Sequence, residues 1–192
     1  MPSKQVSIPG VEKRRFTVTM EGTTPLLCHR FSDEAKKSIL DKQMKRASAT
    51  KAKAPKDPEQ LYRGSMYQTE EGKPGFPAGA IKKACISAGR FLDVAMTHVR
   101  GAFFVMGDIL PLTGEPRMHM HHVRIGGKVA DIRFRAEFPE WSIDLDILYN
   151  PDVISEEGIV NILETAGFHI GIGDWRPERN GTFGMFQVQR KG

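Results

Sequence analysis

The order of two helix-type segments among strand-type segments is the feature that most constrains the fold. Apolar residues recur three or four positions apart within 77–92 and again within 155–167, which is the spacing of one buried helix face. Apolar segments typical of strands lie at 15–20, 102–106, 131–138, 141–147 and 183–189. This order predicts a ferredoxin-like βαββαβ fold of the α+β class, an antiparallel sheet with both helices on one face.

The chain of 192 residues is long enough for one domain with a proper core and short for two. We therefore expect a single domain over 1–192 with two additions. One is a long basic insertion at about 32–75, after the first strand, where the sequence becomes polar and loses its steady periodicity. The other is a β-ribbon at about 115–149, with a turn at Gly126 and Gly127.

Positive charge is concentrated in that insertion. The net charge of the whole chain is +5, and the stretch from Lys36 to Arg63 holds nine basic and three acidic residues, which is +6, so the remainder is −1. A concentrated basic segment is typical of a polyanion partner. A solvated loop whose lysines aid solubility is the alternative, and the charge alone leaves both open.

The segment 167–188 combines glycine, arginine and aromatic residues. If it binds phosphate, Gly171, Gly173 and Gly181 expose backbone N–H groups, the arginines add charge, and the aromatic rings offer faces on which bases stack. The candidate side chains are Trp175, Arg176, Arg179, Phe183 and Phe186. The alternative is a tight connection in which Trp175 fills the core and the glycines only permit turns.

Two further places are candidates for contact with nucleic acid. The helix that starts at Pro77 presents free N–H groups and a favourable dipole to phosphate, with Lys82 and Lys83 nearby; an ordinary helix with solvated lysines is the alternative. His119 and His121 share one face of a predicted strand. That spacing suits metal binding, but the sequence fixes no third ligand. We therefore predict no metal site, and histidines that either line a nucleic-acid groove or pack.

Other chemistry is not indicated by the sequence. It contains no P-loop, dinucleotide fingerprint or Ser-His-Asp arrangement, so we expect no cofactor and a binding protein rather than an enzyme. Asp144 and Asp146 share a strand face that we interpret as solvent-facing. There is no apolar run near the ~18 residues of a membrane span and no hydrophobic signal region. A cytoplasmic protein without a membrane partner is expected.

Three short stretches, near both ends and in the middle of the chain, share features with one known family. They are 22–27 after the opening strand, 75–84 at the helix start, and the glycine-rich segment 167–188. With these stretches the chain resembles the RAMP superfamily, the ferredoxin-like RNA-binding proteins of CRISPR systems, and most nearly its Cas7-like backbone subunits. A stand-alone, phage-encoded relative that coats single-stranded nucleic acid fits the same residues.

The resemblance implies a protein that grips the phosphate backbone of single-stranded RNA or DNA, RNA in the first instance. It also implies assembly along the strand, as a homo-oligomer or as a subunit of a ribonucleoprotein. The residues expected to contact nucleic acid are Lys42, Lys45, Arg46, Lys51, Lys53, Lys82, Lys83, His119, His121, Trp175, Arg176, Arg179, Phe183 and Phe186.

Two other functions stay open. Cas6-like RAMP endoribonucleases often carry a general-base histidine after the first strand, and some Cas7-like subunits carry a target-cleaving aspartate there. By this likeness His29 would deprotonate a 2′-hydroxyl in a metal-independent endoribonuclease, and Asp33 would support a metal in a target-cleaving subunit. As ordinary residues, His29 is a polar surface residue and Asp33 caps a helix. The other function is an inhibitor that mimics a CRISPR subunit.

Overall fold

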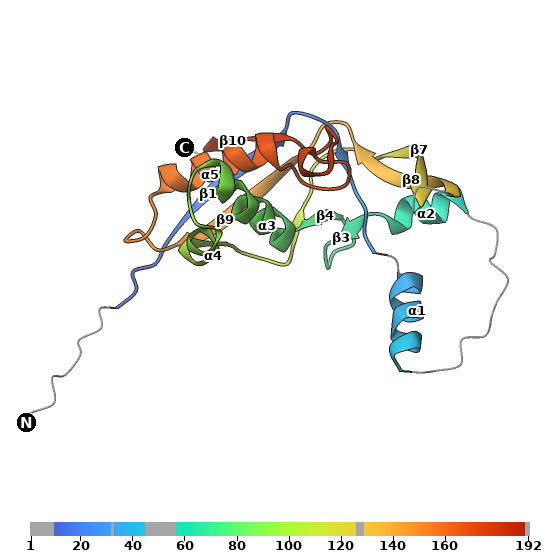
Figure 1. Ribbon diagram of the computed structural model, residues 1–192, viewed down its shortest axis with the longest axis horizontal. Helices are drawn as coiled ribbons and strands as arrows, with labels where there is room; N and C mark the ends of the chain where they lie inside the picture. Colours follow the sequence, from blue (N-terminus) through green and yellow to red (C-terminus); the bar gives the residue numbers. More distant parts are fainter. Residues whose placement is uncertain (1–9, 32, 45–56, 126–128, 191–192) are drawn as a thin grey trace, which may run out of the picture.

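A computed structural model describes residues 10–31, 33–44, 57–125 and 129–190 (Figure 1). The strands are β1 (Arg14–Gly22), β2 (Leu26–Leu27), β3 (Tyr67–Gln68), β4 (Pro74–Pro77), β5 (Phe103–Val105), β6 (Ile109–Pro111), β7 (Arg117–Ile125), β8 (Val129–Phe138), β9 (Ser142–Tyr149) and β10 (Phe186–Arg190). The helices are α1 (Asp33–Gln43), α2 (Pro58–Gly64), α3 (Ala78–Ala88), α4 (Met96–Ala102) and α5 (Glu156–His169), with 3-10 turns at Gly89–Phe91 and Pro177–Arg179.

The main sheet has four strands in the order β10-β1-β9-β5, and every neighbouring pair is antiparallel. Helix α3 lies between β1 and β5 in the chain, and α5 lies between β9 and β10. Strand, helix, two strands, helix, strand in this spatial order is the ferredoxin-like arrangement. The predicted α+β fold class is therefore confirmed by the strand order itself.

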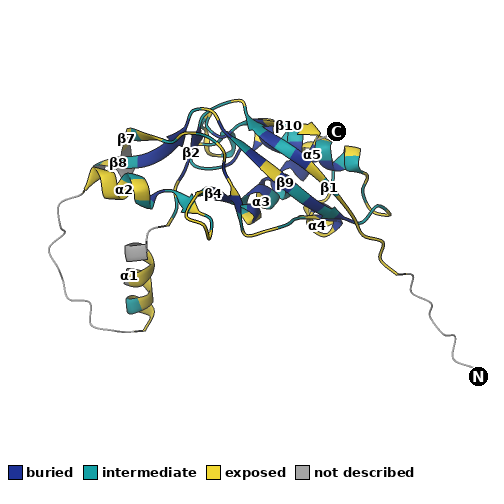
Figure 2. Cartoon of the chain, turned by 180° about the vertical axis from the view of Figure 1, so that it is seen from behind, coloured by how far each residue is buried: buried dark blue, intermediate teal, exposed yellow. Residues whose placement is uncertain are grey.

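The core lies between this sheet and its two helices. Val18 and Met20 of β1 are buried on the same face as Leu145 of β9, while the residues between them point to the other face, as period-2 alternation requires. Figure 2 shows this alternation as changes of colour along β9. Ile81 of α3 and Leu163 of α5 are fully buried against the sheet. Each such side chain contributes roughly 1.5–3 kcal/mol by leaving water.

Helix α5 begins where the sequence indicates but ends later. The Ser155 hydroxyl accepts a hydrogen bond from the Gly158 N–H at 3.1 Å, which is an N-cap. Gly167 resembles a C-terminal cap in the sequence, yet the helix continues to His169. A Cβ at Gly167 would collide with the carbonyl oxygen of Phe186, so this glycine permits the close approach of β10 to α5.

The insertion at 32–75 contains more structure than its sequence pattern indicates. Helix α2 begins at an N-cap, because the Asp57 carboxylate accepts hydrogen bonds from the N–H groups of Glu59 and Gln60. Strands β3, β4 and β6 then form a small sheet. Helix α1 projects away from the rest of the molecule (Figure 1), and its Ile39 and Leu40 are 44% and 50% exposed.

The ribbon is a hairpin of β7 and β8, which β2 extends into a three-stranded sheet. Strand β9, which the sequence places in the ribbon at about 115–149, instead pairs with β1 and β5 in the main sheet. Helix α2 covers part of β8, where the Ala136 N–H donates to the Ser65 hydroxyl at 2.8 Å. Within the described ranges, no helix is long and apolar enough to cross a membrane.

Candidate nucleic-acid interface

Residues 170–185, between α5 and β10, form a glycine-rich loop that packs directly against the chain after β1. The Asp174 N–H donates to the Leu27 carbonyl at 2.9 Å, and the Gly184 N–H donates to the Pro25 carbonyl at 2.8 Å. At Gly173 φ is +78°, and a Cβ there would lie 2.6 Å from the Leu27 carbonyl oxygen. Only glycine tolerates both the positive φ and this close approach.

Two of the loop's glycine N–H groups, which were expected to be free for phosphate, are already hydrogen-bonded to backbone carbonyls. The Gly171 N–H donates to the Ala166 carbonyl at 2.8 Å, and the Gly181 N–H donates to the Arg176 carbonyl at 3.2 Å. These two amides were expected to face a phosphate, but both already have backbone acceptors. These two glycines serve the tight path of the loop, whereas Gly173, the third glycine expected to expose its N–H group, lines the pocket.

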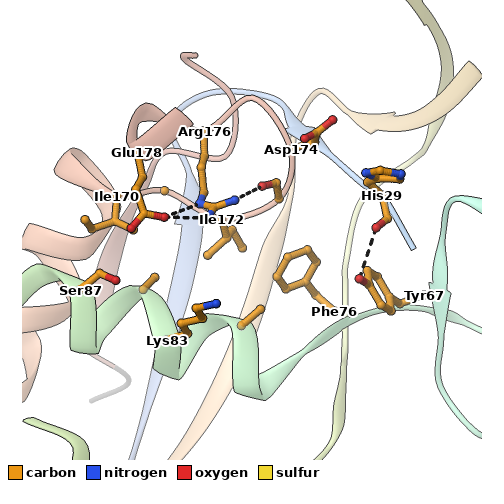
Figure 3. A pocket seen from close by; sticks show the side chains of 14 residues that line it. His29, Tyr67, Phe76, Lys83, Ser87, Ile170, Ile172, Asp174, Arg176 and Glu178 are labelled. Carbon is orange, nitrogen blue, oxygen red and sulfur yellow. Dashed lines mark hydrogen bonds and ion pairs between the residues drawn. The ribbon is translucent and has the colours of Figure 1, made fainter. Parts of the chain in front are cut away.

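A pocket of about 300 Å³ lies between this loop and α3. Figure 3 shows Lys83 on the α3 side, Arg176 and Asp174 on the loop side, and His29 at one end beside Tyr67. The three sequence stretches singled out above therefore meet here: 75–84 and 167–188 line the pocket, and 22–27 supports the loop from behind.

The two neighbouring lysines of α3 have different roles. The Lys82 ammonium donates to the carbonyls of Val99 and Phe103 at 2.7 and 2.5 Å and lies 3.5 Å from the centroid of the Phe103 ring. Burial lowers the pKa of Lys82 to about 8, with Cys85 acting weakly in the other direction. Lys82 thus joins α3 to α4 and β5, which argues against its expected role at a phosphate.

Lys83 is exposed, lines the pocket and makes no ion pair with any residue in the described ranges. Its ammonium is a compact charge on a flexible stem, suited to a phosphate group. Of the two lysines expected at this helix start, Lys83 is the one that the structure presents to the pocket.

Arg176 is held in place by its neighbours. Its Nε and Nη2 donate to the Glu178 carboxylate at 3.2 and 2.6 Å, and its Nη1 donates to the Gly173 carbonyl at 3.0 Å. A guanidinium has five N–H donors, so two remain for a ligand. Burial raises the pKa of Glu178, but Arg176, Arg90 and a hydrogen bond from Ser87 together hold it below its ordinary value. Glu178 therefore stays charged and fixes the guanidinium at the pocket.

An aromatic cluster joins the loop to the hairpin. The His119 ring lies 5.7 Å from that of Phe183, and the His121 ring lies 5.0 Å from that of Trp175. The two histidines share a face, and His119 Nδ1 lies 2.6 Å from the Glu137 carboxylate. Four of the predicted site residues are thereby brought together from β7 and the loop.

Trp175 lies at the surface of this cluster. It is 43% exposed and has φ of +54°, a conformation that costs about 1–3 kcal/mol for a non-glycine residue. The alternative in which Trp175 fills the core is therefore wrong. Arg179 is also exposed, at the end of a 3-10 turn in the same loop.

His121 is 7% exposed, and neither of its ring nitrogens has a hydrogen-bond partner among the described residues. Burial, followed by the charge of Arg135 and by its neighbour His119, lowers the pKa of His121 to about 4. Arg135, buried on the adjacent strand, forms an ion pair with the partly exposed Asp174 that joins the hairpin to the loop. In the described part of the chain, no three His, Cys, Asp or Glu residues are grouped to hold a metal ion.

Phe186 was expected to stack on a base or to shape the path of the nucleic acid, and this prediction is wrong. It is 3% exposed and packs edge-on against Trp141 at 6.4 Å between ring centroids. As the first residue of β10 it points into the core with the alternation of that strand, so a base cannot reach it.

The remaining predicted residues are spread more widely. His29 lies at one end of the pocket, and the Tyr67 hydroxyl donates to its carbonyl at 3.4 Å. Desolvation by the surrounding chain, with the charges of Arg135 and Arg133, lowers the pKa of the His29 imidazole to about 4. Lys42 is exposed on α1, and Asp33 is the first residue of that helix. Lys45, Arg46, Lys51 and Lys53 lie outside the described residues.

Sequence reasoning missed several pocket residues. Ser87 lines the pocket and follows Lys83 by one helical turn, so helix periodicity could have found it. Asp174 also lines it, and so does Tyr67, whose place among charged residues of the insertion left packing or contact with a ligand open. Tyr67 comes from a two-residue strand in the insertion, and the partner of Asp174 lies on the hairpin. No local pattern marks contacts between segments so far apart in the chain.

Neither the family models nor the curated proteins contain a match to this chain. Among solved structures, the chain is similar to the crystal structure of Cmr6 from Pyrococcus furiosus, with 11% identity, a TM-score of 0.46, and coverage of 94% of this chain and 100% of that one. It is also similar to the cryo-EM structure of the Type III-B Cmr-beta bound to cognate target RNA. There the identity is 12%, the TM-score is 0.45, and the match covers 92% of this chain and 59% of that chain's length.

Proposed function

We propose that this chain is a Cas7-like member of the RAMP superfamily that binds single-stranded nucleic acid, RNA in the first instance. The strand crosses the pocket between α3 and the glycine-rich loop, and copies of the protein assemble side by side along it. One observation carries the proposal: of the three stretches that resemble the family, 75–84 and 167–188 line one pocket, and 22–27 accepts hydrogen bonds from the loop that forms its wall.

The charges at the pocket suit a phosphate group. Lys83 provides a mobile ammonium, and Arg176 provides two further N–H donors in a fixed plane. The carboxylates there are already paired, Glu178 with Arg176 and Asp174 with Arg135. The unpaired charge that faces the pocket is therefore positive.

The aromatic cluster extends this surface toward the hairpin. Trp175 is exposed and Phe183 is half-buried beside it, with ring centroids 6.5 Å apart. Stacking of a base on such a ring contributes roughly 1–3 kcal/mol and tolerates any base. Phosphate contacts at the pocket and stacking at Trp175 together favour binding without strong sequence preference.

The test is fluorescence anisotropy of a labelled single-stranded oligonucleotide titrated with the protein at rising salt. Binding by Lys83 and Arg176 releases counterions, so the logarithm of the affinity is expected to fall linearly with the logarithm of the salt concentration. A duplex of the same sequence is the control and binds more weakly, because its bases are not free to stack. Absence of binding at low salt, or binding that salt does not weaken, contradicts the proposal.

A second function, cleavage of RNA by His29, is favoured by one observation, the position of its imidazole at the pocket. With its pKa at about 4, the ring is neutral at pH 7 and can accept a proton, but a base this weak is poorly matched to that pH. Incubation of labelled hairpin RNA with the wild type and with His29→Ala separates the functions. Cleavage by the wild type alone, without added metal, favours the nuclease.

A further inference from the structure

We propose that a surface patch next to the pocket, formed by Phe91, Phe168 and His169, is a stacking platform for further bases of the bound strand. This inference rests on the proposed function and adds to it a second base-binding surface. The patch lies where the end of α5 meets the 3-10 turn that follows α3, a region that the sequence analysis does not single out.

The rings of the patch already form a short stack. Phe91 and His169 have ring centroids 4.3 Å apart and an interplanar angle of 11°, and Phe168 meets His169 edge-on at 4.9 Å and 86°. Phe91 is 49% exposed, Phe168 is 64% exposed, and His169 is exposed as well. Exposed apolar side chains that form one contiguous patch, unlike scattered ones, are typical of an interaction surface. A planar base can continue a parallel stack of this kind.

The patch is continuous with the pocket. His169 is followed by Ile170, which lines one end of the pocket together with Ser87 and Glu178 (Figure 3). Arg90 bridges the two regions: its Nη2 donates to Glu178 at 2.9 Å, and its guanidinium carbon lies 5.7 Å from the centroid of the Phe91 ring. A strand that leaves the pocket at this end therefore meets the patch next.

The size of the pocket requires such an extension. A volume of about 300 Å³ is at the lower end of small-ligand sites, so a strand gripped there must continue over the surface on both sides. At the His29 end the strand reaches the cluster of Trp175 and Phe183, and at the Glu178 end it reaches the patch.

The chemistry of the patch favours bases over an apolar peptide or a second protein surface. Its rings present flat faces, and the exposed Arg90 beside them suits the phosphate that joins two stacked nucleotides. Stacking without base-specific hydrogen bonds fits a protein that tracks the strand backbone.

The test compares oligonucleotide binding by the wild type with that of Phe91→Leu, which removes the ring but keeps apolar bulk, and of Phe91→Trp, which keeps a ring. Phe104→Leu is the control, because Phe104 is 52% exposed on β5, the edge strand of the sheet. We expect Phe91→Leu to weaken binding about tenfold and Phe91→Trp to stay within about twofold of the wild type. The salt slope should not change, because no phosphate contact is lost. Circular dichroism confirms that each variant is folded.

Equal affinity for the wild type and Phe91→Leu, with salt-dependent binding intact, overturns the platform and leaves the proposed function standing. An equal loss in Phe91→Leu and Phe91→Trp also overturns it, because a ring is then not what matters. A change in self-association with unaltered affinity for the oligonucleotide shows that a second copy of the chain covers the patch. If the wild type binds no oligonucleotide, the proposed function itself fails.

Discussion

The two faces of the main sheet differ in what their side chains can bind. The face without helices presents Thr17 and Thr19 of β1 and Asp144 and Asp146 of β9. Its polar groups satisfy one another: Thr19 donates to Asp144 at 2.7 Å, and Arg15 lies 3.6 Å from Asp146. The helix side carries the pocket, with Lys83 exposed beside it.

RNA-recognition domains with this kind of sheet stack bases on its open face. Here the centre of that face is threonine and aspartate, and carboxylates repel a phosphate backbone. The pocket, with Lys83 exposed beside it, lies on the other side, although Arg15 and Phe104 are exposed on the open face. The ferredoxin-like fold alone therefore does not determine which face of the sheet binds nucleic acid; the side chains on each face do.

The largest expected effect is on stability, from a substitution in the glycine-rich loop that forms one wall of the pocket on the helix side. Gly184 has φ of +66°, and a Cβ there would collide with the Ile172 carbonyl oxygen. We expect Gly184→Ala to lower the free energy of unfolding by about 3 kcal/mol or more, measured by chemical denaturation. Gly79→Ala is the matched control, because a Cβ at Gly79 meets nothing within 4 Å; in helix α3 it should be neutral or slightly stabilising. Similar losses in both variants contradict this account of the loop.

The second prediction sharpens the distinction between the neighbouring lysines. Lys82→Met leaves the carbonyls of Val99 and Phe103 without their charged donor, so it should cost about 2 kcal/mol of unfolding free energy. Lys83→Met removes only an exposed amine and should stay within about 0.5 kcal/mol of the wild type. Thermal and denaturant unfolding of both variants checks this; equal stabilities would show that Lys82 does not hold α3 to its neighbours.

The third prediction concerns pH and the hairpin side of the site. His121 has its pKa lowered to about 4 in the folded protein, against about 6.5 in an unfolded chain. Above pH 6.5 the ring is neutral in both states and pH has no effect through it. As the pH falls toward 4, the unfolded state binds the proton first and stability is lost, by about 2 kcal/mol between pH 7 and pH 5.

Denaturation at several pH values in this window, with the wild type and His121→Leu, isolates that contribution. The variant should lose less stability than the wild type between pH 7 and pH 5, because it has one fewer group to protonate on unfolding. Parallel pH profiles for the two proteins count against a buried, neutral His121.

The smallest expected effect is on affinity for RNA, and it compares a lysine at the pocket with an arginine on the open face of the sheet. Lys83→Ala should weaken binding of single-stranded RNA about tenfold and lower the salt slope by about 1, as for a phosphate contact. Arg15→Ala removes the same charge from the open face, where Arg15 lies beside Asp146, and should change affinity by less than about twofold. Equal losses would mean that net charge, and not the pocket, governs binding.

The sequence predicts the fold of this chain better than its site. Helices α3 and α5 are long and strongly periodic, and the alternation in β1 and β9 identifies the buried face, so local patterns suffice for the ferredoxin-like order. His119 and His121 were expected to share a face and do so, because period 2 is a local property of a strand.

What could not be predicted depends on contacts between distant segments. Lys82 and Lys83 both lie off the apolar stripe of α3, and only the position of α4 and β5 decides which of them is buried. The ion pair of Arg135 with Asp174 joins a hairpin to a loop 39 positions further along the chain (174 − 135 = 39). Phe186 shares its sequence segment with Trp175, which is exposed, and Phe183, which is half-buried, yet its place at the start of β10 puts it in the core.

The most direct test of the central claim is photo-crosslinking of the protein to single-stranded RNA that carries 4-thiouridine, with the crosslinked peptides mapped by mass spectrometry. If the strand crosses the pocket, crosslinks fall within 76–87, at the end of β4 and in α3, and within 170–183 of the glycine-rich loop, and salt that prevents binding abolishes them. Crosslinks concentrated on the open face, at β1 and β9, with none in these two segments, would contradict the account.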